Sequence, residues 1–309
     1  MFDADKKRFD VEHALSMYAT SYAILPAAAI YDVESLKSLS EVTSKCHIYV
    51  IGHAPKISIE KVEQHNQHLH LTSKVGGEIV CVKIKLPEGA ILKHVGDRFH
   101  VFGPSGEEYG FEDADLALAI KRQHPMVFDV LYIGQAYGKE GSRTALDRLR
   151  KHETLQRISL SESPAEKQLM VILLEIVSGN RMMTMFNPRA ANTDDGDSRI
   201  KSGLEKLFKT TEKERVSLYE AGLIRYFRPK YNKEFKDSFP STNMKVLSDC
   251  YKKDFSGLIA EICFDDLPWN LQSEAVAAKQ YHIARYDLHS AEERSMFFSK
   301  DRQPRQKLP

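Results

Sequence analysis

The chain of 309 residues is poor in cysteine and in long hydrophobic runs. Its four cysteines form no Cys-x-x-Cys pair; they are Cys46, Cys81, Cys250 and Cys263. In a chain of this size, such scattered cysteines indicate reduced thiols rather than a disulfide framework. The longest apolar runs, YAILPAAAIY and LMVILLEIV, fall well short of the ~20 residues that a membrane-spanning helix needs. We therefore expect no membrane association.

An excess of charge of one sign is also lacking, because 44 Lys and Arg balance 43 Asp and Glu. The total charge therefore neither indicates nor excludes a nucleic-acid partner. Over residues 1–120, 121–240 and 241–309 the formal net charge is −5, +6 and 0. We expect an anionic partner to bind the middle segment, although solvated lysines would give the same excess. The start, MFDADKKRFD, has no apolar signal sequence, so we expect a cytoplasmic protein.

Several common chemical motifs are missing too. No Gly-x-Ser-x-Gly element is present, and GPSGEEYG lacks the Lys-Ser/Thr and the helix of a phosphate-binding loop. His65, His68 and His70 in HNQHLH suggest zinc, but no cysteine or carboxylate stands at ligand spacing. Because this run crosses into a strand, we expect its rings to point to both faces. A polar strand entry is therefore favoured over a metal site.

What the sequence contains is a mixture of strand and helix patterns. In the first region, HIYVIG, HLHLTS, EIVCVKIKL and RFHVFG predict strands, and a helix is predicted at 111–124. In the middle, MVFDVLYIG and the buried run LMVILLEIV predict strands, 142–156 predicts a helix, and SESPAEKQ predicts a helix start. A helix over 203–227 is expected to break near Thr210 and to end before Pro229. GLIAEICF and HIARYDL predict two further strands.

These patterns predict an α/β (α+β) chain in three parts. The first, residues 1–118, is an N-terminal α+β region for recognition or assembly. The second, residues 119–240, is a small module with a short central β-sheet flanked by helices. The third, residues 241–309, is a β-containing extension whose end, 299–309, we expect to be a disordered tail.

The middle part places five polar side chains in a suggestive order. Tyr132 opens a Tyr-Ile-Gly element at a strand end. Arg148 and His152 follow on one predicted helix, a turn apart, so both can reach one ligand. Glu220 lies on the apolar side of its helix, where a buried carboxylate needs a metal or an ion-pair partner. Asn232 follows in RPKYN.

In this order the elements resemble the GIY-YIG nuclease superfamily over residues 126–236. The resemblance implies a metal-dependent endonuclease that hydrolyses phosphodiester bonds, with double-stranded DNA as partner and Mg²⁺ or Mn²⁺ as cofactor. It implies that Arg148 binds the scissile phosphate and that Glu220 is the metal ligand. It also implies that Tyr132 and His152 handle protons and position water, and that Asn232 fixes the geometry near the glutamate. A homodimer and a role in restriction or phage defence fit the same analogy.

One element of the family pattern is missing. No Gly-Ile-Tyr strand stands shortly before Tyr132, where residues 119–122 read AIKR. Some restriction-type members tolerate an insertion here, so Tyr109 is the candidate for the missing tyrosine, and Lys121 is another polar group within reach. If neither serves, the resemblance implies a catalytically inactive nucleic-acid-binding or adaptor protein. A structural or regulatory protein that binds neither metal nor DNA is the third alternative.

Overall fold

The computed structural model describes residues 8–95, 98–109, 113–138, 144–162, 164–177, 181–240 and 244–288. The strands of its main sheet are β1 (Val11–Pro26), β2 (Ile48–Pro55), β9 (Val127–Gln135), β10 (Lys167–Ile176), β11 (Arg181–Phe186), β12 (Gly257–Cys263), β13 (Asn270–Ser273), β14 (Val276–Lys279) and β15 (Tyr281–Asp287). Within the described residues this sheet has nine strands in the order β14-β13-β9-β2-β10-β1-β12-β15, with β11 also paired to β1. The fold is a mixed α/β one, as predicted, but the expected short central sheet is wrong.

The sheet is large because β1 extends it beyond β10. One half of β1 pairs antiparallel with β10, and the other half lies between β11 and β12. Most of β1 is buried on both faces, so its sequence shows no alternation of polar and apolar residues. This is why the sequence does not reveal the strand.

All three predicted regions contribute to the main sheet. Strands β1 and β2 come from 1–118, β9 to β11 come from 119–240, and β12 to β15 come from 241–309. The parallel pairing of β13 with β9 and of β12 with β1 joins the last region to the other two. The predicted boundaries therefore do not divide this sheet.

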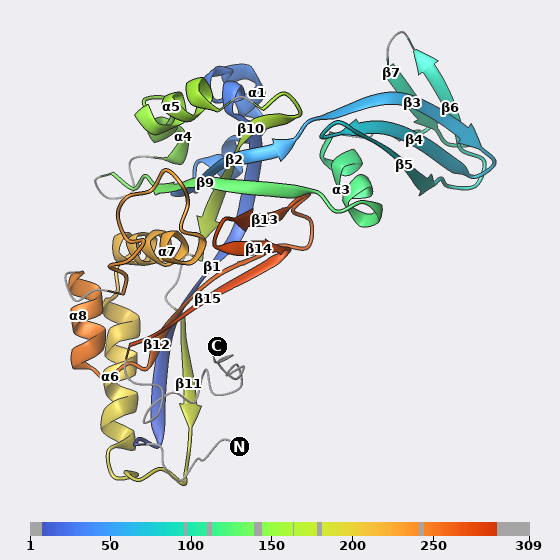
Figure 1. Ribbon diagram of the computed structural model, residues 1–309. Coiled ribbons are helices and arrows are strands. Elements are labelled where there is room, and N and C mark those ends of the chain that lie inside the picture. The colour runs from blue at the N-terminus through green and yellow to red at the C-terminus, as the bar shows by residue number, and fades with distance from the viewer. Residues whose placement is uncertain are drawn as a thin grey trace, which may run out of the picture.

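An insertion separates β2 from β9. It contains β3 (Ile57–His65), β4 (His68–Val75), β5 (Glu78–Lys85), β6 (Ile91–Val95), β7 (Arg98–Phe102), β8 (Glu108–Tyr109) and α3 (Asp113–Gln123). Its strands form two separate sheets, β3-β4-β5 and β6-β7-β8, within the described residues. Figure 1 shows them as an arm that projects from the main sheet.

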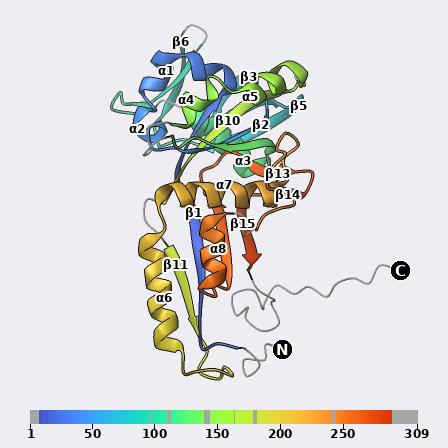
Figure 2. The ribbon, with the colours of Figure 1, turned by 90° about the vertical axis from the view of Figure 1, so that its left-hand side faces the viewer.

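The other helices cover the main sheet on both faces. They are the 3-10 helix η2 (Ala27–Tyr31), α1 (Val33–Lys37), α2 (Ser40–Thr43), α4 (Ala145–Leu149), α5 (Glu153–Ser161), α6 (Gly196–Lys209), α7 (Glu212–Phe227) and α8 (Lys245–Lys252). Tyr49 and Ile51 of β2 join the hydrophobic cluster of α4 and α5, whereas Ile48 and Val50 join that of α7. Alternate residues of a strand face opposite sides, so these helices lie on opposite faces. Figure 2 shows α7 crossing the molecule between α4 and α5 on one side and α6 and α8 on the other.

Two helix predictions are wrong and two are confirmed, one of them the helix at 111–124, which is α3 within the described residues. The helix expected at 142–156 is two helices, since α4 ends at Leu149 and α5 begins at Glu153. No helix starts among the described residues of SESPAEKQ, where the chain passes from α5 to β10. The break near Thr210 is confirmed between α6 and α7. The expected tail, 299–309, lies outside the described residues. Among the helices that the structure describes, none is both long and apolar enough to cross a membrane.

Candidate active site

The pairing of β2 with β9 brings two tyrosines together. The strands are antiparallel, and Tyr49 lies opposite Gly134. A Cβ atom on Gly134 would lie 2.5 Å from the Tyr49 hydroxyl oxygen and 2.8 Å from Cε1 of Tyr132. Glycine at this position therefore leaves room for both rings, whose centroids are 6.2 Å apart.

Tyr49 takes the place that was expected for Tyr109. Tyr109 lies in β8, which belongs to the separate β6-β7-β8 sheet of the arm. Lys121 is also engaged elsewhere, because its Nζ donates to the Leu267 carbonyl oxygen at 2.5 Å. The candidate for the second tyrosine is thus corrected from Tyr109 to Tyr49.

His152 completes a group of three aromatic rings. Its centroid lies 5.0 Å from that of Tyr132 and 5.5 Å from that of Tyr49. As the N-cap of α5, its Nδ1 accepts the Leu155 N–H at 3.2 Å. Burial and the charge of Arg148 lower the His152 pKa to about 4. The ring is therefore neutral near pH 7, carries its proton on Nε2, and acts there as a donor.

Arg148 reaches the tyrosines from α4. A capping box at Thr144 begins this helix, and the Ala145 N–H donates to the Cys46 carbonyl at 2.9 Å, close to the start of β2. The Arg148 side chain is exposed, and its positive charge lowers the pKa of Tyr49. Burial raises the pKa of both tyrosines, and the guanidinium charge opposes that rise. Arg148 and His152 are thus neighbours at this site although they do not share a helix.

Glu220 lies on α7 and interacts electrostatically with the same group. The residue is 9% exposed, and burial is the main reason that its pKa rises to about 8. Hydrogen bonds from Gln135 oppose this rise, the charge of Glu234 adds to it, and the charge of Arg148 lowers it. The Glu220 charge in turn raises the pKa of both tyrosines. The carboxyl therefore belongs to the same electrostatic cluster as the tyrosines and the arginine.

Asn232 supports the strand that carries Tyr132. Its Oδ1 accepts the Ile133 N–H at 2.9 Å, and its Nδ2 donates to the Ile133 carbonyl at 2.8 Å. The Tyr231 N–H also donates to the Leu131 carbonyl, at 3.0 Å. Residues 231 and 232 therefore pair with β9 much as a neighbouring strand would. The resemblance implies that Asn232 fixes the geometry near the glutamate, and in the structure its side chain holds the backbone beside Tyr132.

The surroundings of Glu220 fit a cation that keeps most of its waters. Within the described part of the chain, no group of three or more His, Cys, Asp or Glu side chains is placed to hold a metal. Mg²⁺ needs only one or two carboxylates besides water and phosphate oxygens. Burial and the nearby Glu234 disfavour the ionised form of Glu220, so a bound cation would relieve both effects.

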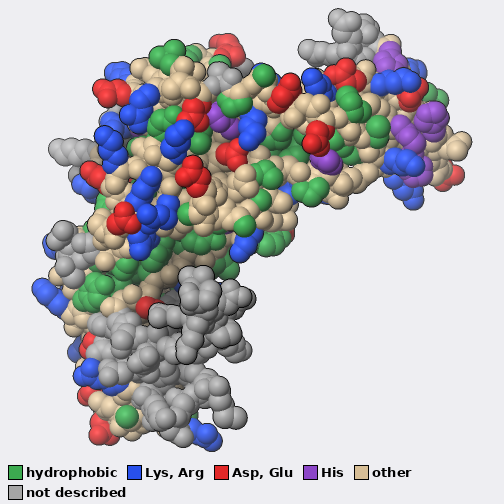
Figure 3. Space-filling model, viewed as in Figure 1, with side chains coloured by type: hydrophobic (Ala, Val, Ile, Leu, Met, Phe, Trp, Pro, Cys, Tyr) green, Lys and Arg blue, Asp and Glu red, His purple; other side chains and the backbone are tan. Residues whose placement is uncertain are grey.

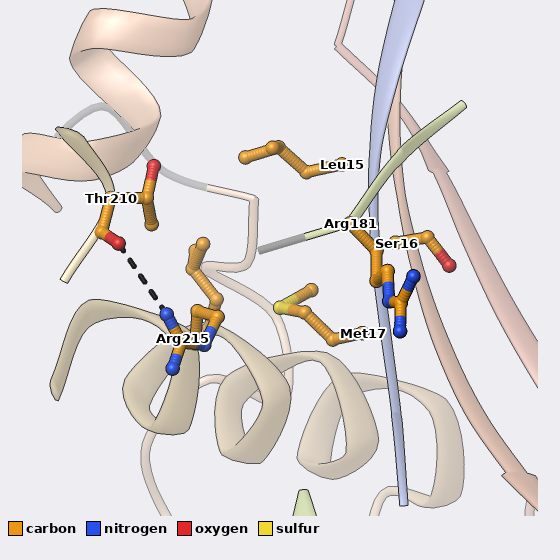
Figure 4. Close-up of a pocket in the computed structure, with 7 residues that line it drawn as sticks. Leu15, Ser16, Met17, Arg181, Thr210 and Arg215 are labelled. Carbon is orange, nitrogen blue, oxygen red and sulfur yellow. Dashed lines mark hydrogen bonds between the residues drawn. The ribbon is translucent and has the colours of Figure 1, made fainter. Parts of the chain in front are cut away.

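A small pocket between β1 and the start of α7 is separate from this site. It is lined by Leu15, Ser16, Met17, Arg181, Thr210, Arg215 and Leu218 (Figure 4). Arg215 donates to the Thr210 carbonyl at 3.5 Å. The cavity of about 10 Å³ has room for one water molecule, so it is no ligand site.

The residue that sequence reasoning missed is Tyr49. Its strand was predicted from HIYVIG, and the Ile-Tyr pair in that run was the available signal. Two features make the pair hard to recognise. His47 stands where the Gly-Ile-Tyr element has its glycine, and residues 56–126 separate the strand of Tyr49 from that of Tyr132. His47 is buried, and its Nδ1 donates to the Ala136 carbonyl at 2.8 Å, which holds the ends of β2 and β9 together.

Comparison with known proteins gives no relative for this chain: no family model matches it, and neither curated proteins nor solved structures show a significant match.

Proposed function

We propose that the protein is a metal-dependent endonuclease of the GIY-YIG type, which hydrolyses phosphodiester bonds in double-stranded DNA. The observation that supports this most strongly is the meeting of Tyr49, Tyr132, Arg148 and His152 beside Glu220. These side chains come from β2, β9, α4, the N-cap of α5, and α7. Together they offer two donors for a phosphate, one hydroxyl for water with a second beside it, and one carboxylate for a cation.

Arg148 and His152 are the phosphate-binding residues in this proposal. The guanidinium fork of Arg148 matches two oxygens of a phosphate group. His152 adds a neutral donor at Nε2, because Nδ1 accepts the Leu155 N–H. A neutral ring binds the phosphate without repelling the adjacent guanidinium. Both donors favour oxygens on which negative charge develops during hydrolysis.

Tyr132 is assigned as the base and Tyr49 as its supporting donor. Hydrolysis forms a bond from the water oxygen to phosphorus, transfers a water proton to a base, and breaks the ester bond. Tyr132 is half-buried and open to water, whereas Tyr49 is 1% exposed. Burial raises the Tyr132 pKa, but a hydrogen bond from Tyr49 lowers it and so stabilises the phenolate. The leaving oxygen takes its proton from solvent.

Glu220 is assigned as the ligand of Mg²⁺ or Mn²⁺. When bound, the ion supplies positive charge to the phosphate and to the leaving oxygen. The Glu220 charge raises the pKa of both tyrosines, and pairing with a cation would offset that charge. Tyr132 would then release its proton more easily.

The alternative function, an inactive nucleic-acid-binding adaptor, requires that the site lacks the tyrosine of the Gly-Ile-Tyr element. Tyr49 supplies a hydroxyl beside Tyr132 and Arg148, which favours catalysis.

Cleavage of plasmid DNA with Mg²⁺ tests the proposal, with Glu220→Ala and Arg148→Ala as variants. We expect the native protein to cleave and both variants to lose about 10²-fold or more in rate. Equal cleavage by all three proteins would contradict the proposal, and DNA binding without cleavage would favour the adaptor.

A further inference from the structure

The β3-β4-β5 sheet of the arm has a polar face that the site above does not use. Its other face is apolar and buried, with Val62, Leu69 and Val82 among the core residues. Side chains alternate along a strand, so the intervening residues point outward. The outward face carries two cross-strand rows, His65-His68-Lys85 and Glu63-His70-Lys83.

A tight turn gathers the three histidines on this face. Residues 66 and 67 connect β3 to β4, and Asn66 has a φ of 54°, which asparagine tolerates better than most residues. The turn sets His65 opposite His68, and the rings of His65 and His70 are 4.7 Å apart. The expectation that these rings point to both faces is therefore wrong, because the run is a hairpin and not one continuous strand.

The face has a surplus of cations. Its carboxylate, Glu63, pairs with Lys61 at 2.8 Å. Lys83 and Lys85 have no ion-pair partner among the residues that the structure describes. Desolvation and the charges of His65 and Lys83 lower the His70 pKa, so the neighbours repel a proton there. A bound anion would relieve this repulsion.

We propose that this surface, the arm face (His65, His68, His70, Lys83 and Lys85), binds the phosphate backbone of double-stranded DNA away from the cleavage site. The inference rests on the proposed function, since the nuclease site is the reason to expect DNA. A metal is a poorer occupant, because the described residues include no three-ligand group here. Figure 3 shows Lys, Arg and His side chains gathered at the far end of the arm.

The spacing of the arm face suits a duplex. Outward side chains on one strand repeat about every 6.6 Å, since each residue advances ~3.3 Å. Neighbouring phosphates on one strand of B-DNA are about 7 Å apart, because each step rises about 3.4 Å and also turns around the helix axis. Lys83 and Lys85, two positions apart on β5, can therefore bind phosphates of one strand.

The path of the chain links the arm face to the candidate active site. Strand β2 carries Tyr49 and leads into β3 of the arm (Figure 1). The path from Tyr49 to His65 is at most about 53 Å, at ~3.3 Å per residue. At about 3.4 Å per step of B-DNA, the arm face would contact the duplex within about 15 base pairs of the cut.

The test measures binding to a 40-base-pair duplex over a range of salt concentrations, in EDTA so that no cleavage occurs. We expect Lys83→Ala/Lys85→Ala to bind about tenfold more weakly and its log–log salt slope to be shallower by about 1.8. The matched control, Lys245→Ala/Lys252→Ala on the exposed side of α8, should bind as the native protein does. Lys83→Arg/Lys85→Arg should restore the slope, because it restores both charges.

Other outcomes separate this inference from the proposed function. Equal slopes for the native protein and Lys83→Ala/Lys85→Ala overturn the inference, as does displacement of the duplex by polyglutamate as readily as by unlabelled DNA. The same preparations are then assayed for cleavage with Mg²⁺. If the native protein cleaves DNA but Lys83→Ala/Lys85→Ala binds the duplex as tightly as the native protein does, the inference alone is overturned. Lysine-dependent binding without cleavage overturns the nuclease proposal alone, and no binding at all overturns both.

Discussion

Tyr49 and Tyr132 lie nearly parallel, with an angle of 26° between their rings, although the whole arm separates them in sequence. The antiparallel register of β2 and β9 produces this contact, and Gly134 leaves the space for it. The two strands, and not any local motif, therefore assemble the tyrosine pair. Each assigned role at the site can be tested separately.

Tyr49→Phe should reduce the rate of DNA cleavage by about 10²-fold, since the Tyr132 phenolate loses a supporting hydrogen bond. Tyr109→Phe is the matched control, because Tyr109 lies in β8 of the arm. Single-turnover cleavage of a labelled duplex measures both effects. A large loss in Tyr109→Phe with no loss in Tyr49→Phe would reverse the assignment.

Glu220 should make the metal-free protein less stable as the pH rises. Its pKa is raised mainly by burial, from 4.5 to about 8, so the folded chain keeps a proton that the unfolded chain releases. The contribution is fully present below pH 4.5 and is lost as the pH approaches 8, on the order of 5 kcal/mol in total. Glu220→Gln lacks this titration.

Urea unfolding at pH 5 and pH 8, in EDTA, measures the effect on both proteins. The free energy of unfolding of the native protein should fall more between these pH values than that of Glu220→Gln. Parallel pH dependence in the two proteins would show that Glu220 does not titrate as the structure indicates.

The affinity of the protein for Mg²⁺ should rise with pH, whereas the stability of the metal-free protein should fall. The ion needs the ionised carboxylate, so below pH 8 it must displace a proton, and affinity should rise about tenfold per pH unit before it levels off. Glu234→Gln removes a charge that raises the Glu220 pKa, so its curve should level off at lower pH. Calorimetric titration from pH 6 to pH 9 gives both curves. An affinity independent of pH would exclude Glu220 as the ligand.

Asn232→Ala should destabilise the protein by about 2 kcal/mol, because it leaves the Ile133 N–H and carbonyl groups without their side-chain partner. Cleavage should also slow, since Tyr132 is the adjacent residue. Asn192→Ala is a suitable control, because Asn192 bonds to Asp195 and to the Asp194 N–H, away from the site. Thermal melts and cleavage rates distinguish the two variants. Unchanged cleavage in a destabilised Asn232→Ala would limit Asn232 to a structural role.

Local sequence signals predicted many of the elements correctly. Alternation in EIVCVKIKL identified β5, and the apolar run LMVILLEIV identified the buried strand β10. The break at Thr210 follows from Thr211, which caps α7 with Glu214. These features depend on neighbouring residues, so the sequence shows them directly.

Features that depend on distant contacts were not predicted. The double burial of β1 hides its periodicity, and the break before α5 arises because the His152 ring caps a new helix. Likewise, the pairing of β2 with β9 is set by packing across the insertion, so HIYVIG gave a strand but not its partner. The candidate residues Tyr132, Arg148, His152 and Glu220 could be named from the sequence because they fall in an ordered motif.

The most direct test is a double-mutant cycle on Tyr49 and Tyr132, measured as single-turnover cleavage of duplex DNA with Mg²⁺. If the tyrosines act as one unit, Tyr49→Phe/Tyr132→Phe should cleave no more slowly than Tyr132→Phe alone. Losses that multiply in the double variant would mean that the two hydroxyls act independently, and cleavage at the native rate by all three variants would contradict the proposed site.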